Sequence, residues 1–284
     1  MMMMNSPESK GNLTQKDALL RYRSADTAAG ARPLAEGTTG TSRTHKDIRP
    51  VPFSGLLTNK LLTALPGEDF ARLLPFLEPV SLSINEDLYD FGQAVHEVYF
   101  PESAVISHLY IWEDGSTAEA ALIGREGLTG LSAIFDAPAL PCLTQAIIPG
   151  TALRMSVEVL RQEFARSKAM QRLLLAHAGI RILQLSQRAV CNGRHTVIER
   201  LCSWLLMLHD RVGDDQLLLT HEQIAHHLGT RRAGITSAAN SLRDGQIIKS
   251  SRGQIRIINR EGLEMAACEC YRTLGQQNLT AALP

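Results

Sequence analysis

The sequence is poor in aromatic residues and has no long hydrophobic run. Only 5% of its 284 residues are Phe, Trp or Tyr. No apolar stretch approaches the roughly 20 residues that a transmembrane helix needs. Residues 1–11 also lack the basic-then-apolar order of a secretion signal. We therefore expect a protein that stays in the cytoplasm and has no membrane partner.

Cysteine is scarce as well. The five cysteines are an odd number scattered over a long chain, so reduced thiols are expected in place of a disulfide framework. Cys268 and Cys270 are close enough in sequence to suggest a metal site or an oxidant sensor. One residue between two thiols is not a usual zinc spacing, and no second pair accompanies them, so we interpret them as ordinary thiols. The sequence predicts no metal and no cofactor, and leaves a redox role for these thiols open.

Net charge is absent too, but the charges are unevenly distributed. The chain has 29 basic and 29 acidic residues. Residues 222–260 contain seven basic residues and only two acidic ones, Glu222 and Asp244. A basic window in a neutral protein indicates a site for a polyanion, with a solvated basic face as the alternative.

The chain divides into segments of different composition. Residues 1–50 have few large apolar side chains, which predicts a disordered arm, and two short helices are expected within residues 56–75. Residues 79–155 alternate apolar and polar positions in short runs separated by Gly, Pro and Asp-Gly, a pattern typical of a β-barrel or sandwich. The expected strands are residues 80–84, 97–100, 104–106, 108–112, 118–123, 144–148 and 152–155.

A long helix is expected after residue 156. Its apolar residues recur at alternating spacings of 3 and 4, as along the seam of a coiled coil. Such a seam predicts self-association, and packing on the chain's own β domain is the alternative. The predicted seam residues are Leu173, Ala176, Ile180, Leu183 and Val190.

Residues 220–242 have the pattern of a helix-turn-helix. Thr220 and Gln223 fit a capping box, so a helix is predicted to begin there. Gly229 allows a tight exit, and a second helix is expected from about Arg231. In a helix-turn-helix, the second helix inserts its first turns into the major groove of DNA. Its predicted buried stripe comprises Ile235, Ala238, Ala239 and Leu242.

Two short strands around a basic turn are expected over residues 247–258, and they complete a winged helix. An arginine on the second helix would bind guanine through two hydrogen bonds, whereas Lys249 and Arg252 would neutralise phosphates. A plain helical hairpin in an unrelated fold is the alternative. The predicted DNA-binding residues are Thr220, Arg231, Arg232, Thr236, Ser237, Asn240, Lys249 and Arg252.

Four segments resemble those of Crp/Fnr-type transcriptional regulators: Leu88–Gly92, Val98–Ser103, Ile123–Leu131 and Leu219–Leu242. The resemblance implies an α+β fold with an N-terminal, jelly-roll-like β-roll sensor domain, a long dimerisation helix and a C-terminal winged helix-turn-helix. It also implies a homodimer that binds a palindromic operator in double-stranded DNA, with RNA polymerase as a further partner.

The predicted domain boundaries follow from that order of elements. They are 1–50 for the arm, 51–167 for the β-roll with its flanking short helices, 168–192 for the dimerisation helix, 193–272 for the winged helix and 273–284 for a flexible tail.

The sequence departs from the nucleotide-binding members of the family it resembles. Those members hold the ribose with a Gly-Glu pair and the cyclic phosphate with Arg-Ser or Arg-Thr. Here Leu131 follows Gly130, and Pro141 stands near the position of the arginine, so the cation that a buried phosphate needs is missing. Cyclic AMP and cyclic GMP are therefore not expected effectors. The candidate residues for another effector are Gly124, Arg125, Glu126, Gly130, Leu131 and Cys142.

Two further departures concern metals and operators. The oxygen-sensing members use cysteines near the N-terminus to hold an iron–sulfur cluster, whereas the first cysteine here is Cys142, so no such cluster is expected. Many relatives have Arg-Glu on the recognition helix where this chain has Arg232-Ala233. Its operator should therefore differ from theirs at the base pair that the glutamate contacts.

No catalytic residue is predicted. His221, Glu222 and His226 resemble a zinc-protease motif, but a spacing of five places the two rings about 140° apart around a helix. We predict a non-enzymatic Crp/Fnr-type transcription regulator controlled by an unidentified signal. The alternative is a regulatory or scaffolding protein whose β-roll and winged helix bind protein partners.

Overall fold

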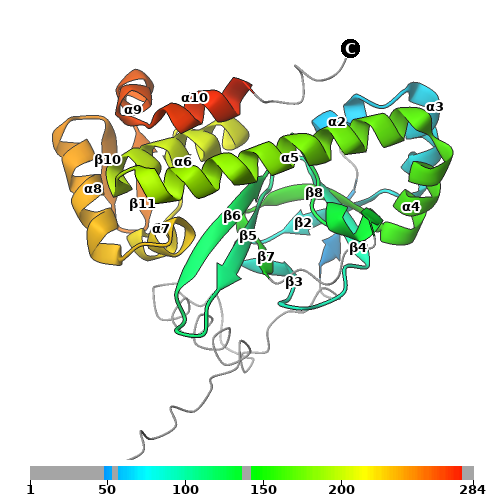
Figure 1. Cartoon of the computed structure of the whole chain (residues 1–284), viewed down its shortest axis with the longest axis horizontal. Helices are drawn as coiled ribbons and strands as arrows, with labels where there is room; N and C mark the ends of the chain where they lie inside the picture. The colour runs from blue at the N-terminus through cyan, green and yellow to red at the C-terminus, as the bar shows by residue number, and fades with distance from the viewer. Residues whose placement is uncertain (1–47, 53–56, 136–141, 277–284) are drawn as a thin grey trace, which may run out of the picture.

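The computed structural model describes residues 48–52, 57–135 and 142–276. Most of the predicted arm and most of the predicted tail lie outside these ranges, as does Pro141. Within the described ranges, no helix is both long and apolar enough to cross a membrane. The described residues form a β-roll, a long helix that runs across it, and a winged helix at one end (Figure 1).

Two antiparallel four-stranded sheets build the β-roll. One has the strand order β1-β2-β8-β4, and the other has the order β3-β7-β5-β6. Together with the helices that follow, these sheets confirm the predicted α+β class. The strands are β1 (Arg49–Pro50), β2 (Glu78–Leu82), β3 (Glu86–Tyr89), β4 (Glu97–Pro101), β5 (Val105–Ile111), β6 (Thr117–Ile123), β7 (Leu143–Ile148) and β8 (Gly150–Ser156).

The strand predictions were wrong at several places. β1 lies within the predicted arm of residues 1–50 and pairs with β2, which spans residues 78–82 where 80–84 was predicted. The predicted strands 104–106 and 108–112 are one strand, β5. Ser107, which separates the two apolar runs, is fully buried, and its hydroxyl donates to Glu119 on β6 over 2.8 Å, so the strand continues through it. β3 was not predicted, because the acidic pair Glu86 and Asp87 at its start disfavours a strand by propensity alone.

The short helices before the β-roll differ in extent from the prediction. α2 (Lys60–Thr63) is a single turn, and the Asn59 side chain caps it by accepting from two backbone N–H groups. α3 (Gly67–Leu73) begins where the first helix was expected to end, and a 3₁₀ turn (Leu74–Phe76) follows it. Pro66 explains this start, since proline is compatible with the entry to a helix but not with its interior.

Two helices lead out of the β-roll. α4 (Val157–Arg166) and α5 (Lys168–Arg194) each begin after a serine, Ser156 and Ser167, whose hydroxyl accepts from a backbone N–H of the first turn. At 1.5 Å per residue, the 27 residues of α5 span about 40 Å. α5 therefore reaches from the β-roll to the winged helix (Figure 1).

The winged helix begins with α6 (Val197–Val212). A capping box between Thr196 and Glu199 starts this helix, and Gly213 ends it with a left-handed φ of 74°. β9, β10 and β11 form a small sheet in the order β10-β11-β9. The other elements are β9 (Gln216–Leu217), α7 (His221–Leu228), α8 (Arg232–Asp244), β10 (Ile248–Ser251), β11 (Gln254–Ile257), α9 (Arg260–Ala266) and α10 (Glu269–Gln276).

One hydrophobic core joins the winged helix to the β-roll. Trp204 and Leu205 on α6 are buried in it, and so are Val105, Leu122 and Ile147 from three strands of the β-roll. The predicted boundary at residue 193 therefore falls between two units that share apolar contacts.

Candidate nucleic-acid interface

The first helix of the helix-turn-helix is α7, and its start confirms the predicted capping box. The Thr220 hydroxyl accepts from the Gln223 N–H over 3.1 Å, and the Gln223 side chain accepts from the Thr220 N–H over 2.9 Å. α7 ends at Gly229, whose φ is 58°. A Cβ at Gly229 would lie 2.9 Å from the Cβ of Ala118 on β6, so glycine serves both the left-handed backbone and the close approach of the β-roll.

α8 turns its apolar side inward and its polar side to solvent. Ile235 and Ala239 are fully buried in the core of the winged helix, and Leu242 is 2% exposed. Thr236 on the polar side is half-buried. The exposed predicted residues at the start and on the polar side of α8 are Arg231, Arg232, Ser237 and Asn240.

Arg232 has the geometry expected of a base-contacting residue. It is the first residue of α8, and its side chain is 70% exposed. Its Nε lies 3.5 Å from a carboxylate oxygen of Glu222 on α7, which orients the guanidinium without burying it. The remaining N–H groups can then approach a base edge in front of the helix.

His221 joins three parts of the winged helix and was not predicted to contribute. Its Nδ1 lies 3.2 Å from the Thr236 hydroxyl on α8, and its Nε2 lies 3.1 Å from the Ser250 hydroxyl on β10. Burial and the nearby charge of Arg232 lower the pKa of His221, which favours the neutral ring. His221 is therefore a positioning residue that holds the recognition helix against the wing, and sequence spacing alone carried no signal of this role.

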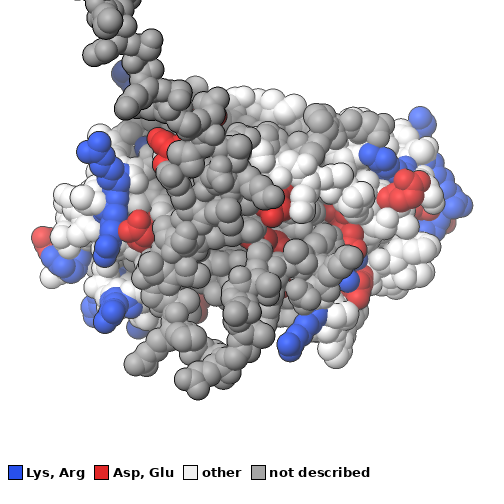
Figure 2. Space-filling model, turned by 90° about the horizontal axis from the view of Figure 1, so that it is seen from below, with Lys and Arg blue, Asp and Glu red and all other residues white. Residues whose placement is uncertain are grey.

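The wing is formed by β10 and β11. Lys249 lies directly opposite Arg256 in the strand register, and both are exposed. Two like charges at facing positions repel each other, and a bound phosphate would relieve this repulsion. Arg252 is exposed in the turn, beside Gly253 with its φ of 75°. Lys and Arg side chains lie at the end of the molecule where α8 lies, with some acidic ones among them, and others lie at the opposite end (Figure 2).

Arg256 was absent from the predicted set, although the sequence contains a signal for it. Ile255 and Ile257 on either side are buried, and successive residues of a strand face opposite sides. An arginine between two such residues must point outward.

A buried carboxylate fixes the winged helix to the β-roll. Glu119 on β6 accepts from Arg188 of α5 over 2.7 Å and from the Trp204 indole of α6 over 3.0 Å. Its other oxygen lies 3.1 Å from Nδ1 of His227 on α7. Burial alone would raise the pKa of Glu119, but the Arg188 charge and the contacts with His227 and Ser107 hold it below its usual range. One ionised side chain thus connects four elements.

The predicted effector residues do not converge on one cavity of the β-roll. The half-buried Glu126 carboxylate pairs with Arg211 of α6 at 2.7 Å and accepts from the Gly124 N–H over 3.2 Å. Arg125 donates to the Asp210 carbonyl of α6 over 3.4 Å. Together with Arg181, these side chains line a cavity of about 110 Å³ between β6, α5 and α6. This half of the predicted set therefore faces the winged helix.

The other half lies within the β-roll. Gly130 has a φ of 90°, and a Cβ there would lie 2.8 Å from the Tyr89 hydroxyl. Leu131 begins a 3₁₀ turn, and Cys142 is buried next to the start of β7. Burial raises the pKa of Cys142 to about 11, so its thiol is protonated at neutral pH.

α5 does not present the predicted seam as a single face. Leu173 is 4% exposed and belongs to the core of the β-roll, and Ile180 packs against the same core. The helix has turned these two positions towards its own chain, whereas Leu183 and Val190 are exposed. The large apolar side chains that α5 leaves exposed are Leu175, Ile182, Leu183, Leu185 and Val190.

Residues 199–266 match the family of Crp-like helix-turn-helix domains. The match covers α6 to α9, and so includes α7, α8 and the wing. A curated relative is the global nitrogen regulator of Synechocystis sp., which is 23% identical over 177 residues. That alignment covers 59% of this chain and 79% of the regulator.

Solved structures share the fold at low sequence identity. FixK2 from Bradyrhizobium japonicum is 20% identical with a TM-score of 0.59, covering 68% of this chain and 98% of FixK2. A structure from Eubacterium rectale assigned to the crp/fnr family of transcriptional regulators is 18% identical with a TM-score of 0.60. It covers 73% of this chain and 97% of that one.

Proposed function

We propose that the chain is a transcription regulator of the Crp/Fnr type, which acts as a homodimer and recognises a palindromic operator through α8. The match of residues 199–266 to Crp-like helix-turn-helix domains supports this proposal. The observation that carries this proposal is the solvent-facing polar side of α8, with Arg232 70% exposed at its first turn. In the proposed complex, Arg232, Thr236, Ser237 and Asn240 face the major groove. Phosphate contacts come from Lys249, Arg252 and Arg256.

Exposed side chains on α5 support a dimer interface. Leu175 and Ile182 are seven residues apart, and Leu185 follows three residues later, which is the repeat of a two-stranded coiled coil. They are 54%, 64% and 42% exposed. A second copy of α5 would remove this apolar surface from water, so we place the two-fold axis along this face.

Leu131 argues against cyclic nucleotides as the signal. It follows Gly130 at the position where the nucleotide-binding members have the glutamate that holds the ribose. Cyclic AMP and cyclic GMP are therefore expected to leave the melting temperature unchanged. A ligand at 100 times its Kd would add about 2.7 kcal/mol to the free energy of unfolding. A clear rise in melting temperature would therefore contradict this expectation.

Selection of genomic fragments by the full-length protein tests the proposed function. We expect enrichment of a palindromic motif with half-sites about 10 base pairs apart. Affinity for a recovered site should fall steeply with salt, because each phosphate contact releases a counterion. Absence of any enriched motif, together with salt-insensitive binding, would favour a protein-binding module instead.

A further inference from the structure

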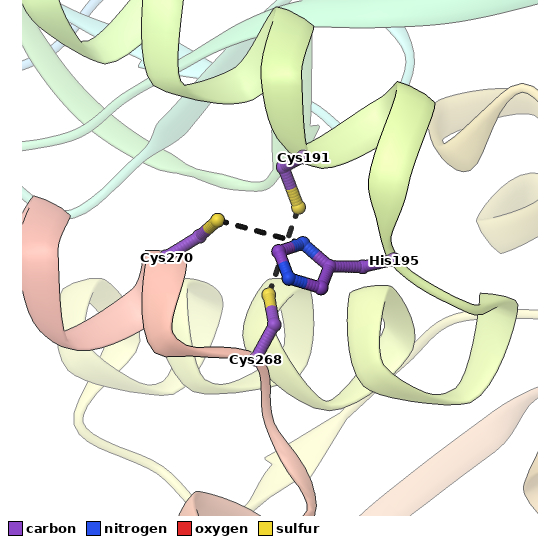
Figure 3. A group of neighbouring side chains, drawn as sticks. All are labelled: Cys191, His195, Cys268 and Cys270. Atoms are coloured by element: carbon purple, nitrogen blue, oxygen red, sulfur yellow. Dashed lines mark hydrogen bonds between the residues drawn. The ribbon is translucent and has the colours of Figure 1, made fainter.

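Four potential metal ligands that are far apart in sequence meet where α5 joins the winged helix. Cys191 lies in the last turn of α5 and His195 caps that helix, whereas Cys268 and Cys270 lie at the start of α10. Their ligand atoms all lie within 4.8 Å of one another. Figure 3 shows the four side chains pointing towards a common centre. We call this group the Cys3His cluster.

Two distances in the cluster are close to the edges of a tetrahedron around one metal ion. Bonds of about 2.3 Å to sulfur and about 2.0 Å to nitrogen place two sulfurs about 3.8 Å apart, and a sulfur and a nitrogen about 3.5 Å apart. In the structure, Cys191 Sγ and Cys268 Sγ are 3.6 Å apart, as are Cys270 Sγ and His195 Nδ1. We propose that the Cys3His cluster binds one Zn²⁺ ion with tetrahedral geometry, as a structural site.

The surroundings of the cluster supply the outer contacts that such sites need. The His195 ring presents Nδ1 to the sulfurs, and its Nε2 lies 3.3 Å from a Glu269 carboxylate oxygen, which would fix the tautomer that binds metal. The Gln187 amide donates to Cys270 Sγ over 3.0 Å, and the Ser203 hydroxyl lies 3.0 Å from Cys268 Sγ. Both contacts would stabilise thiolates bound to the metal.

Burial and charge also suit an ion with three thiolates. Cys191, Cys268 and Cys270 are between 2% and 9% exposed, so water is excluded from the sulfurs. Three thiolates and one Zn²⁺ carry a net charge of −1. Arg200 is close enough for its charge to interact with Cys191 and Cys268, and would offset that charge.

Two alternatives to a single zinc ion, an iron–sulfur cluster and a disulfide, are less consistent with this geometry. An iron–sulfur cluster holds its cysteines around several iron atoms, and a group of ligand atoms within 4.8 Å leaves space for a single ion. A disulfide between Cys191 and Cys268 would use two of the sulfurs and leave the convergence of Cys270 and His195 without a role.

Bound zinc would tie α5 to the start of α10 and so set the angle between the dimerisation helix and the winged helix. This step rests on the proposed function, whereas the metal site itself does not. Loss of the ion would free the junction after His195 and change the spacing of the two recognition helices in a dimer.

Metal content and cobalt spectroscopy of the full-length protein test the site. Protein purified under reducing conditions is expected to contain one equivalent of zinc. Replacement by Co²⁺ should give the visible bands of a tetrahedral thiolate complex. Cys268→Ser and Cys270→Ser should lose the bands, while Cys142→Ala, which removes a buried thiol of the β-roll, should keep them. Glu269→Gln should weaken zinc binding by about 10- to 100-fold, as expected for an outer contact of a ligating histidine.

Several results would overturn the proposal. The protein could stay metal-free after zinc is added under reducing conditions. The cobalt-substituted protein could show bands without thiolate character, or Cys142→Ala could lose the bands as fully as Cys268→Ser and Cys270→Ser. Rapid formation of a Cys191–Cys268 disulfide in a protein that binds no zinc would also replace the metal site with a thiol pair.

The link to DNA is measured separately, with a site recovered by genomic selection. Removal of zinc by a chelator is expected to reduce operator affinity at least 10-fold, and added zinc should restore it. Unchanged affinity in a protein that has lost its zinc would refute the coupling but not the site, and absence of operator binding with zinc bound would refute the proposed function alone.

Discussion

Arg232 and Arg252 have the same side chain but different surroundings, and therefore different expected roles. Arg232 starts the recognition helix, and Arg252 lies in the wing turn. Arg232→Ala should weaken the free energy of binding to the operator by about 1–3 kcal/mol and change binding to random DNA little, because it removes a base contact. Arg252→Ala should weaken binding to all DNA sequences alike. It should also reduce the slope of log affinity against log salt concentration by about 1. Fluorescence anisotropy over a salt series measures both.

Arg243→Ala is a suitable control for this pair. Arg243 lies near the C-terminal end of α8 and pairs with Asp244 at 3.0 Å. Arg243→Ala should change neither the affinity for the operator nor the salt dependence of binding. Equal losses on specific and random DNA for Arg232→Ala would remove the assignment of a base contact to that residue.

Glu119 matters because four elements depend on one carboxylate. Glu119→Ala leaves Arg188 without its buried partner, and a broken buried ion pair of this kind costs about 3–5 kcal/mol. Urea unfolding measures the change. Glu113→Ala, at an exposed position of the same β5–β6 hairpin, should stay within about 0.5 kcal/mol. If the two substitutions changed the free energy of unfolding by similar amounts, the Glu119 contacts would contribute no more to stability than an exposed glutamate does.

At the scale of single elements, α5 carries two surfaces. One is buried on the β-roll through Leu173 and Leu174, and the other exposes Leu175 and Ile182. Ile182→Asp should dissociate the dimer, because each apolar side chain buried there contributes about 1.5–3 kcal/mol and two-fold symmetry counts each substitution twice. Sedimentation velocity decides the oligomeric state, and operator binding should fall with it.

Met265→Asp provides the matched control for α5. Met265 is 82% exposed on α9, so the same apolar-to-acidic change there should leave assembly intact. A dimer that survives Ile182→Asp would place the interface on another element.

At the scale of the whole molecule, buried histidines should make stability depend on pH. Burial lowers the pKa of His177 to about 4 and that of His108 to about 3, from 6.5. Below pH 6.5 the unfolded chain therefore binds more protons than the folded one, and stability falls as the pH falls. The slope is about 1.4 kcal/mol per pH unit for each histidine.

Urea midpoints between pH 6.5 and 5 measure this slope before carboxyl groups contribute. Neither ring nitrogen of His177 has a hydrogen-bond partner among the described residues, so His177→Leu removes a titrating group without breaking a bond. Between pH 6.5 and 5, the pH dependence of stability in the variant should be weaker by about 1.1 kcal/mol per pH unit on average, because the unfolded histidine is only half protonated at pH 6.5. A slope unchanged by His177→Leu would show that this ring does not titrate as inferred.

Local patterns in the sequence determined much of the winged helix. The capping box at Thr220, the glycine at 229 and the apolar stripe of α8 act over a few residues, so their spacing alone predicts the helices and their exposed face. The wing strands and the turn at Gly253 follow from the same kind of local alternation. Most strands of the β-roll were predictable for this reason, although their order in two sheets was not.

Only the tertiary structure decided which distant residues meet. Cys191 and Cys268 are 77 residues apart, and spacing within Cys268-Glu269-Cys270 argued against a metal, because the other two ligands come from a different helix. Glu119 reaches Arg188 and His227 in the same way. The face that α5 turns to its own β-roll was also undetermined, since an apolar period of 3.5 residues predicts that a helix packs but not against which partner. Each of these contacts depends on the position of a second element, which local sequence does not encode.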